Sequence, residues 1–260
     1  MHPPLSTQPQ PEPENKYPDC LYMELEGIPV QPDSHEHLAL WTTSTPRQQI
    51  DLHLTIHFNE QWESLDKGRV KFGLKGGELR LKLESSEIPH ESRELVGSLE
   101  LHTAKKKQDP KRSQAPKGIP RRASAIALSL NGNKPPAQVT AGTKQRSAQT
   151  ELTPVTVCHV TQKVTEENPV WIFEEEMGEP VLKGGLNQVK LGTLNILTLP
   201  CRVEATFEVS KRDVCLTDAE GLWPPDISRN KRAVLDRLII QRLLEPKLKP
   251  YLSRSELHYD

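Results

Sequence analysis

The sequence is poor in aromatic residues and in long apolar runs. Phenylalanine, tryptophan and tyrosine make up 5% of the 260 residues, and all hydrophobic types together make up 35%. No run approaches the ~18 consecutive apolar residues that a membrane-spanning helix needs. The first residues also lack the basic stretch and apolar run of a secretory signal peptide. These absences favour a cytoplasmic location and predict no membrane partner.

Cysteine is scarce, and its spacing fits neither a zinc site nor a disulfide framework. The four cysteines, Cys20, Cys158, Cys201 and Cys215, include no C-x-x-C pair. Cys158 precedes His159 in an expected strand, where neighbouring side chains point to opposite faces, so the two are not expected to work as nucleophile and base. We therefore expect free thiols.

The common catalytic motifs are missing as well. The sequence contains no G-x-S-x-G, H-E-x-x-H, P-loop or G-x-G-x-x-G pattern. The best metal-like spacing is that of His35 and His37, which would lie ~6.6 Å apart on one face of a strand. The carboxylate or histidine that would complete such a site is replaced by Trp41, Ala39 and Leu40. We therefore expect no metal and no cofactor. The missing motifs favour a protein that is not an enzyme but do not exclude an enzyme.

Proline is abundant, with 23 residues, and it marks segments that cannot build a core. Residues 1–18 hold six prolines among polar residues, and this predicts a disordered tail. Residues 102–150 hold five prolines and almost no large apolar side chains, which predicts a disordered insert. Between Lys105 and Arg146 the insert carries eleven lysines and arginines against one acid, Asp109.

The basic insert raises two possible partners. Its first cations are the candidates for contact with nucleic acid or with an acidic protein: Lys105, Lys106, Lys107, Lys111, Arg112, Lys117, Arg121 and Arg122. Nucleic acid is possible but not favoured, because no aromatic residues are interleaved for base stacking. Six glutamates around Trp171 could receive the insert, or form only a solvated face: Glu166, Glu167, Glu174, Glu175, Glu176 and Glu179.

Alternating apolar residues predict strands on both sides of the insert. The clearest is Ile50 to Phe58, where every second residue is apolar over nine positions. In RVKFGLKGGELRLKLE, the pair Gly76-Gly77 predicts a tight turn with positive φ and therefore a β-hairpin. Further strands are expected at 21–25, 95–101, 155–160, 170–173, 181–182, 189–199 and 202–209.

One helix is expected near the C-terminus. It begins after an N-cap at Asp226 or Ser228, runs to about Leu244 and ends before Pro246. Its apolar residues form a wide stripe, which predicts that the helix packs on a sheet. On this interpretation Leu238→Asp unfolds the protein, whereas the opposite face, with Arg237 and Arg242, tolerates alanine. If the helix were instead exposed, its cations would suit an anionic surface.

Together these patterns predict a mainly β fold, an antiparallel β-sandwich or barrel with one C-terminal α-helix packed on it and a long disordered insert. Residues 19–101 and 151–260 together form one β-rich domain, or two small β domains. The function that this fold favours is a non-catalytic protein-interaction or scaffolding module with another protein as partner. An enzyme or small-ligand-binding protein with an unrecognised pocket is the alternative.

Two runs and the C-terminal segment carry a resemblance. RVKFGLKGGELRLKLE, EPVLKGGLNQVKLGTLNI and EGLWPPDISRNKRAVLDRLIIQRLLEPKLKPYLSR resemble an uncharacterised family of bacterial, cyanobacterial-type proteins with no assigned activity. The resemblance implies only a bacterial, cytosolic origin. Within the chain, Leu74-Lys75-Gly76-Gly77 recurs as Leu182-Lys183-Gly184-Gly185, by duplication of a hairpin or by chance.

Overall fold

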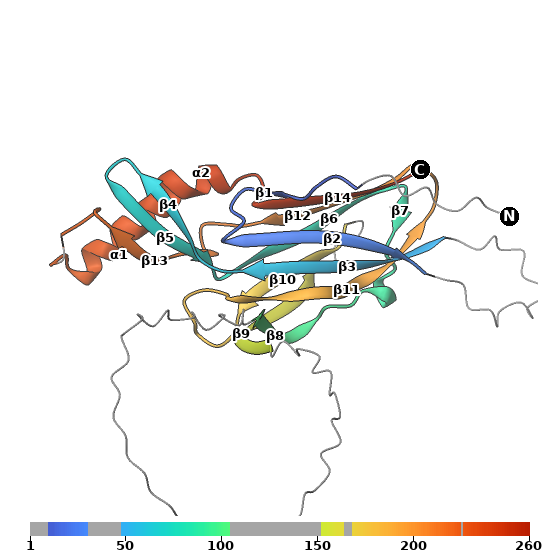
Figure 1. Ribbon diagram of the computed structural model, residues 1–260, viewed down its shortest axis with the longest axis horizontal. Coiled ribbons are helices and arrows are strands. Elements are labelled where there is room, and N and C mark those ends of the chain that lie inside the picture. The colour runs from blue at the N-terminus through green and yellow to red at the C-terminus, as the bar shows by residue number, and fades with distance from the viewer. Residues whose placement is uncertain (1–9, 31–47, 105–151, 164–167, 225) are drawn as a thin grey trace, which may run out of the picture. The chain divides into compact units, whose positions relative to one another are not determined.

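The computed structural model describes residues 10–30, 48–104, 152–163, 168–224 and 226–260. Eleven strands form a large antiparallel sheet in the order β1-β14-β12-β6-β10-β9-β8-β11-β3-β2, with β7 beside β11 (Figure 1). Their bounds are β1 Glu14–Asn15, β2 Leu21–Pro29, β3 Gln49–Phe58, β6 Gly76–Glu84, β7 Ser86–Glu87, β8 Gly97–Ala104, β9 Leu152–Lys163, β10 Val170–Glu175, β11 Gly184–Ile196, β12 Cys201–Glu208 and β14 Ser253–Tyr259.

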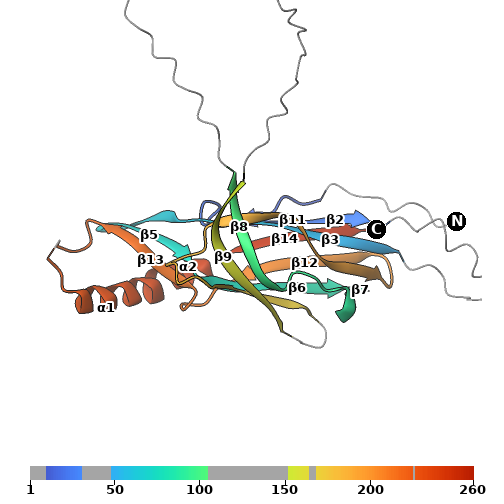
Figure 2. The ribbon, with the colours of Figure 1, turned by 90° about the horizontal axis from the view of Figure 1, so that it is seen from below.

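A second, three-stranded sheet has the order β13-β5-β4. It consists of β4 Gln61–Leu65, β5 Gly68–Leu74 and β13 Val214–Glu220. This sheet lies at the same end of the molecule as the C-terminal helix, on the left in Figures 1 and 2. The predicted architecture is confirmed: the fold is mainly β, the large sheet is antiparallel and nearly closed like a barrel, and one helical segment lies near the C-terminus, between β13 and β14.

Side chains, rather than a backbone ladder, close the large sheet between β2 and β14. The hydroxyl of Ser255 accepts the N–H of Leu25 at 3.1 Å, and the hydroxyl of Ser253 donates to the carbonyl of Leu21 at 3.4 Å. From β1, the amide of Asn15 accepts the N–H of Met23 at 2.9 Å. These contacts satisfy the backbone groups that an edge strand would otherwise leave open.

The enclosed space is filled by apolar side chains from both predicted β segments. Alternate residues of β3, from Ile50 to Phe58, are buried, as the sequence pattern predicts. Phe58, Phe173 and Phe207 meet at the centre with ring centroids 5.8 to 6.0 Å apart, a distance typical of tilted and edge-on aromatic pairs. The packing at this centre holds in place the strands whose ends carry the surface sites described below.

The hairpin predicted at Gly76-Gly77 is wrong. The chain runs from β5 through Lys75 into β6 without reversing, so β5 pairs with β4 and β13 while β6 pairs with β10 and β12. The glycines are required by close approach. A Cβ on Gly76 would lie 2.2 Å from the carbonyl oxygen of Phe173, and one on Gly77 would lie 2.4 Å from the ring of Phe207.

The second LKGG segment differs from the first in its backbone. Gly184 has a positive φ of 98°, whereas Gly76 is not among the residues with positive φ. Residues 181–182, predicted as a strand, lie outside regular structure, although both side chains are buried. The strands β13 and β14 were missed by the sequence pattern.

The predicted tail and insert fall largely outside the described residues. Of the tail, residues 1–9 are not described, but Glu14–Asn15 form β1 and Tyr17 packs edge-on against Phe72 with centroids 5.4 Å apart, so the predicted tail is too long. Of the insert, residues 105–151 lie outside the described part, while residues 102–104 continue β8.

The helical segment is longer than predicted and is interrupted. Helix α1 spans Arg229–Ile239, a π-helical turn spans Ile240–Leu244, and α2 spans Glu245–Leu248. Ser228 is the N-cap, as one of the two expected caps, and accepts the N–H of Lys231. Pro246 does not end the helix, because it occupies the first turn of α2, where a missing N–H costs little.

Candidate functional site

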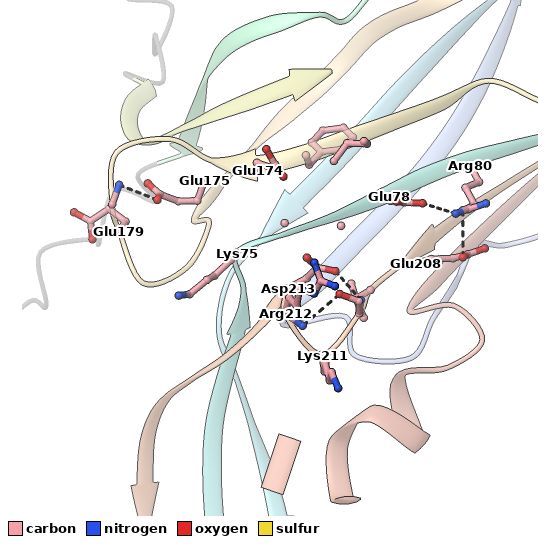
Figure 3. Close-up of a pocket in the computed structure, with 17 residues that line it drawn as sticks. Lys75, Glu78, Arg80, Glu174, Glu175, Glu179, Glu208, Lys211, Arg212 and Asp213 are labelled. Carbon is pink, nitrogen blue, oxygen red and sulfur yellow. Dashed lines mark hydrogen bonds and ion pairs between the residues drawn. The ribbon is translucent and has the colours of Figure 1, made fainter. Parts of the chain in front are cut away.

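A groove of about 930 Å³ opens where β5 passes into β6 (Figure 3). Its floor is the segment Lys75 to Gly77. One wall is the end of β10 and the loop that follows it, with Glu174, Glu175 and Glu179. The other wall is the turn between β12 and β13, with Lys211 and Arg212. The groove therefore has an acidic wall and a second wall on which Lys211 and Arg212 stand beside the acids Glu208 and Asp213.

The backbone of Lys75 ties the two walls together. Its N–H donates to the carbonyl of Asp213 at 2.6 Å, and its carbonyl accepts the N–H of Glu175 at 2.8 Å. On the acidic side, the carboxylate of Glu175 accepts the N–H groups of Met177 and Gly178 at 2.7 and 2.8 Å. Because these bonds are short and local, both walls are held in place without a ligand.

The carboxylates on the floor are already paired. Glu78 forms ion pairs with Arg80 and Lys163, and Arg80 also reaches Glu208 at 3.2 Å. Burial opposes the charge of Glu78, but the hydrogen bonds from Lys163 and Arg80 outweigh it and lower the pKa of this carboxyl. Glu78 is thus held as a carboxylate and is a poor proton donor at neutral pH.

The charges on the walls are not paired in this way. Within the described part of the chain, no ion pair joins Glu174 or Glu179 to a cation, or Lys211 or Arg212 to an acid. The residues that line the groove include neither histidine nor cysteine.

Helix α1 lies beside this groove and turns apolar side chains outward. The exposed fractions of Val234, Leu235 and Leu238 are 60%, 37% and 38%, and that of Leu243, in the turn that follows α1, is 43%. The side chains that seat the helical segment are Ile239 and Ile240, which are partly buried, and Leu244 and Leu248, which are fully buried. The prediction that the whole apolar stripe packs on the sheet is therefore wrong.

The helical period explains this error. At about 100° per residue, Val234 and Leu238 lie about 120° and 160° around the helix from Ile240. Ile240, Leu244 and Leu248 are spaced four residues apart and face the sheet, whereas Val234 and Leu238 face solvent. The apolar residues therefore do not form one stripe.

A cleft of about 280 Å³ separates α1 from β13. Its lining combines Val214, Cys215 and Leu216 of β13 with Ala233, Asp236, Arg237 and Ile240 of the helix, and it shares Lys75 and Lys211 with the groove. Among the described residues, the atom Oδ1 of Asp236 is buried there without a hydrogen-bond partner. Burial raises the pKa of this carboxyl, and the guanidinium of Arg232, with Nε 3.9 Å away, lowers it only in part.

The predicted site residues have mixed outcomes. The metal candidates His35 and His37 lie outside the described residues, as do the eight basic candidates from Lys105 to Arg122. Of the acidic cluster, Glu174, Glu175 and Glu179 meet at the groove. Glu166 and Glu167 are not described, and Trp171 is fully buried, with its indole N–H donating to the carbonyl of Glu94 at 3.0 Å.

The cysteines behave as the sequence analysis expects. All four are free, and Cys215 is half-buried while the others are buried. Burial raises the pKa of the Cys158 thiol to about 12. The side chain of His159 faces the other side of the strand, where its ring lies 3.4 Å from the hydroxyl of Ser98. In the described ranges no three His, Cys, Asp or Glu side chains gather as metal ligands.

Comparison with protein-family models, with curated proteins and with solved structures finds no match to this chain.

Sequence reasoning missed two parts of this region. It did not anticipate the cations Lys211 and Arg212 at the groove, although the polar run Ser210 to Asp213 between two strands is a turn signal. It also placed the outward residues of α1 in the core, because it counted apolar residues on different sides of the helix as one stripe.

Proposed function

We propose that the chain is a non-catalytic, β-rich protein-interaction module that binds another protein through the outward face of α1. The observation that supports it is the joint exposure of Val234, Leu235 and Leu238. Residues at i and i+4 of a helix are neighbours on one face, so these side chains form a short continuous apolar ridge. An amphipathic helix with such anchors is a common way to dock into a groove of a partner.

The charges around the ridge indicate what kind of partner it fits. Five exposed cations stand on α1 and the turn that follows: Arg229, Lys231, Arg232, Arg237 and Arg242. Asp236 is the one acid between residues 229 and 244, and its side chain is turned inward and only 27% exposed. A partner surface with apolar side chains rimmed by carboxylates would complement this face.

The narrowness of the ridge favours a protein over a lipid surface. Helices that lie in a bilayer interface present a wide apolar face, commonly with tryptophan or phenylalanine. Here the outward face has no aromatic residue, and the bulk of Ile239, Ile240, Leu244 and Leu248 is turned toward the sheet. Arginine, which supplies four of the five cations, is enriched at protein interfaces. None of the described helices is long and apolar enough to cross a membrane.

The charged groove supports the same proposal, because it extends the surface next to α1. Lys75 and Lys211 border both the groove and the cleft under the helix, so the two surfaces adjoin. Unpaired charges on an exposed wall steer the encounter with an oppositely charged partner and suppress wrong ones.

Leu238→Asp tests the proposal. The chain is immobilised and exposed to an extract of its source cells, beside a Leu197→Asp control whose side chain is 51% exposed and not on the helix. We expect a protein that is retained by the unchanged chain and by the control but not by Leu238→Asp. Both variants should keep their free energy of unfolding within about 0.5 kcal/mol, as exposed positions do.

Two results would contradict the proposal. The first is equal retention of the same proteins by Leu238→Asp and the unchanged chain. The second is a marked fall in the thermal midpoint of Leu238→Asp, because this would show that the side chain is needed in a packed core rather than at a surface.

A further inference from the structure

We propose that the cleft between α1 and β13 binds an extended acidic segment of a partner protein, which adds to β13 as a new strand. This inference rests on the proposed function only in that the ligand is a protein. It concerns the inner side of α1, whereas the ridge of Val234, Leu235 and Leu238 is on the outer side. The argument depends on the open edge of β13, the shape of the cleft and the charges around it.

The edge of β13 that faces the cleft is open. In the three-stranded sheet β13 is an end strand and pairs only with β5. An antiparallel strand turns half of its N–H and C=O groups toward each side, so an end strand offers a row of groups for pairing. Among the described residues, no backbone–backbone hydrogen bond joins Val214–Glu220 to any element other than β5.

Helix α1 lies apart from this edge of β13 and does not cover it. Between them lies the cleft of about 280 Å³, with Val214 and Leu216 on one side and Ala233 and Ile240 on the other. Pockets for whole small molecules begin at ~300 Å³. The cleft is thus of a size to hold the anchor side chain of a segment whose backbone continues along the strand. Figures 1 and 2 both show α1 running beside β13.

Charge selects an acidic segment. Three cations border the cleft, Lys75, Lys211 and Arg237, and none forms an ion pair with an acid in the part of the chain that the structure describes. The buried Oδ1 of Asp236, which has no hydrogen-bond partner within the described ranges, is an acceptor available to a backbone N–H of the added strand. Carboxylates on the segment would pair with the border cations, while its backbone pairs with β13.

A synthetic peptide tests the proposal directly. The probe is a capped peptide of about eight residues, a usual strand length, that alternates aspartate and valine. One control replaces aspartate by lysine, and a second carries N-methyl groups on alternate amides, which removes strand pairing but keeps the charge. Binding is followed by fluorescence anisotropy, and contact with the cleft by the alkylation rate of Cys215, the one half-buried thiol among the four.

We expect the aspartate peptide to bind and to slow the alkylation of Cys215. Both control peptides should bind at least about tenfold more weakly, the loss of roughly one or two hydrogen bonds or ion pairs. Equal binding of the N-methylated or the lysine peptide overturns the proposal. So does binding that leaves the alkylation of Cys215 unchanged, and so does the absence of binding by the aspartate peptide.

Variants separate this site from the outward face of α1. Ala233→Trp should fill the cleft and abolish peptide binding, and Arg237→Glu should weaken it about tenfold or more. Arg242→Glu is the matched control, because it makes the same charge change at an exposed residue that does not line the cleft. Leu238→Asp should leave peptide binding unchanged, so either proposal can fail alone. Equal loss in Arg237→Glu and Arg242→Glu would reduce the effect to net charge and overturn the cleft site.

Discussion

The hydroxyl of Ser255 accepts the backbone N–H of Leu25 at 3.1 Å, across the seam between β14 and β2. The exposed fraction of Ser255 is only 4%, so water has little access to this donor. The side chain of Ser255 therefore supplies the hydrogen bond that a neighbouring strand supplies elsewhere in the sheet. The same seam explains why two serines occupy the buried face of β14.

Ser255→Ala should leave the N–H of Leu25 buried without an acceptor. We expect the free energy of unfolding to fall by about 1–3 kcal/mol, the cost of an unsatisfied buried group, in urea denaturation followed by tryptophan fluorescence. Ser64→Ala, at an exposed position of β4, is the control and should change it by less than about 0.5 kcal/mol. Equal stability of both variants would mean that the seam is not held by this hydroxyl.

Leu244 and Leu238 should respond oppositely to truncation, although the sequence pattern assigns both to one apolar stripe. Leu244 is fully buried, so Leu244→Ala should cost ~2–5 kcal/mol. Leu238 is 38% exposed, and Leu238→Ala should cost less than about 1 kcal/mol. Chemical denaturation of the two variants side by side checks this. The reverse order would restore the packing predicted from the sequence.

The carboxylate of Glu60 should stabilise the fold above its unfolded pKa. Burial opposes its charge, but hydrogen bonds from Lys183, Thr217 and Lys71 prevail and lower its pKa from 4.5 to about 2. Because the folded pKa is the lower one, the stabilisation is complete above pH 4.5 and is lost as the pH falls toward 2. Glu60→Gln should cost about 2 kcal/mol at pH 7, and the difference should shrink between pH 4.5 and 2. A difference that stays constant over this range would contradict the assignment.

The four thiols should react in a definite order with an alkylating reagent. Burial raises the pKa of Cys20 and of Cys158 to about 12 and raises that of Cys201 as well. Cys215 also has a raised pKa through burial, but it is half-buried and should be modified first in the folded protein. Mass spectrometry of digested samples gives the order. Early modification of a buried cysteine would indicate local opening of its strand.

The alternation of apolar residues was sufficient to predict strands whose two faces differ. The pattern of β3, Ile50 to Phe58, and that of β12, Val203 to Phe207, correspond to burial of every second side chain. The same pattern was silent for β14, where the inward residues are Ser253, Ser255, Leu257 and Tyr259. Ser253 and Ser255 are polar because they form hydrogen bonds to the edge of β2. Pairing with β2 therefore interrupts the apolar alternation of β14.

Two of the wrong predictions have different causes. Gly76 and Gly77 were interpreted as a turn because glycine permits positive φ, but here it permits the close approach of Phe173 and Phe207. The apolar residues of α1 were interpreted as one buried stripe, although Val234 and Leu238 lie on the other side of the helix from Ile240. The first error concerns tertiary geometry, on which local sequence carries no information. The groove, which is assembled from three separate segments, was out of reach for the same reason.

The position of β14 has a consequence for synthesis of the chain. β14 follows every other strand of the large sheet along the chain, yet it lies between β12 and the β1–β2 edge. A ribosome that releases the chain from its N-terminus therefore exposes two strand edges until residues 253–259 have emerged. Domains fold as units once their last essential element is available. Closure of this sheet therefore waits for residues 253–259, which complete the sheet beside β12.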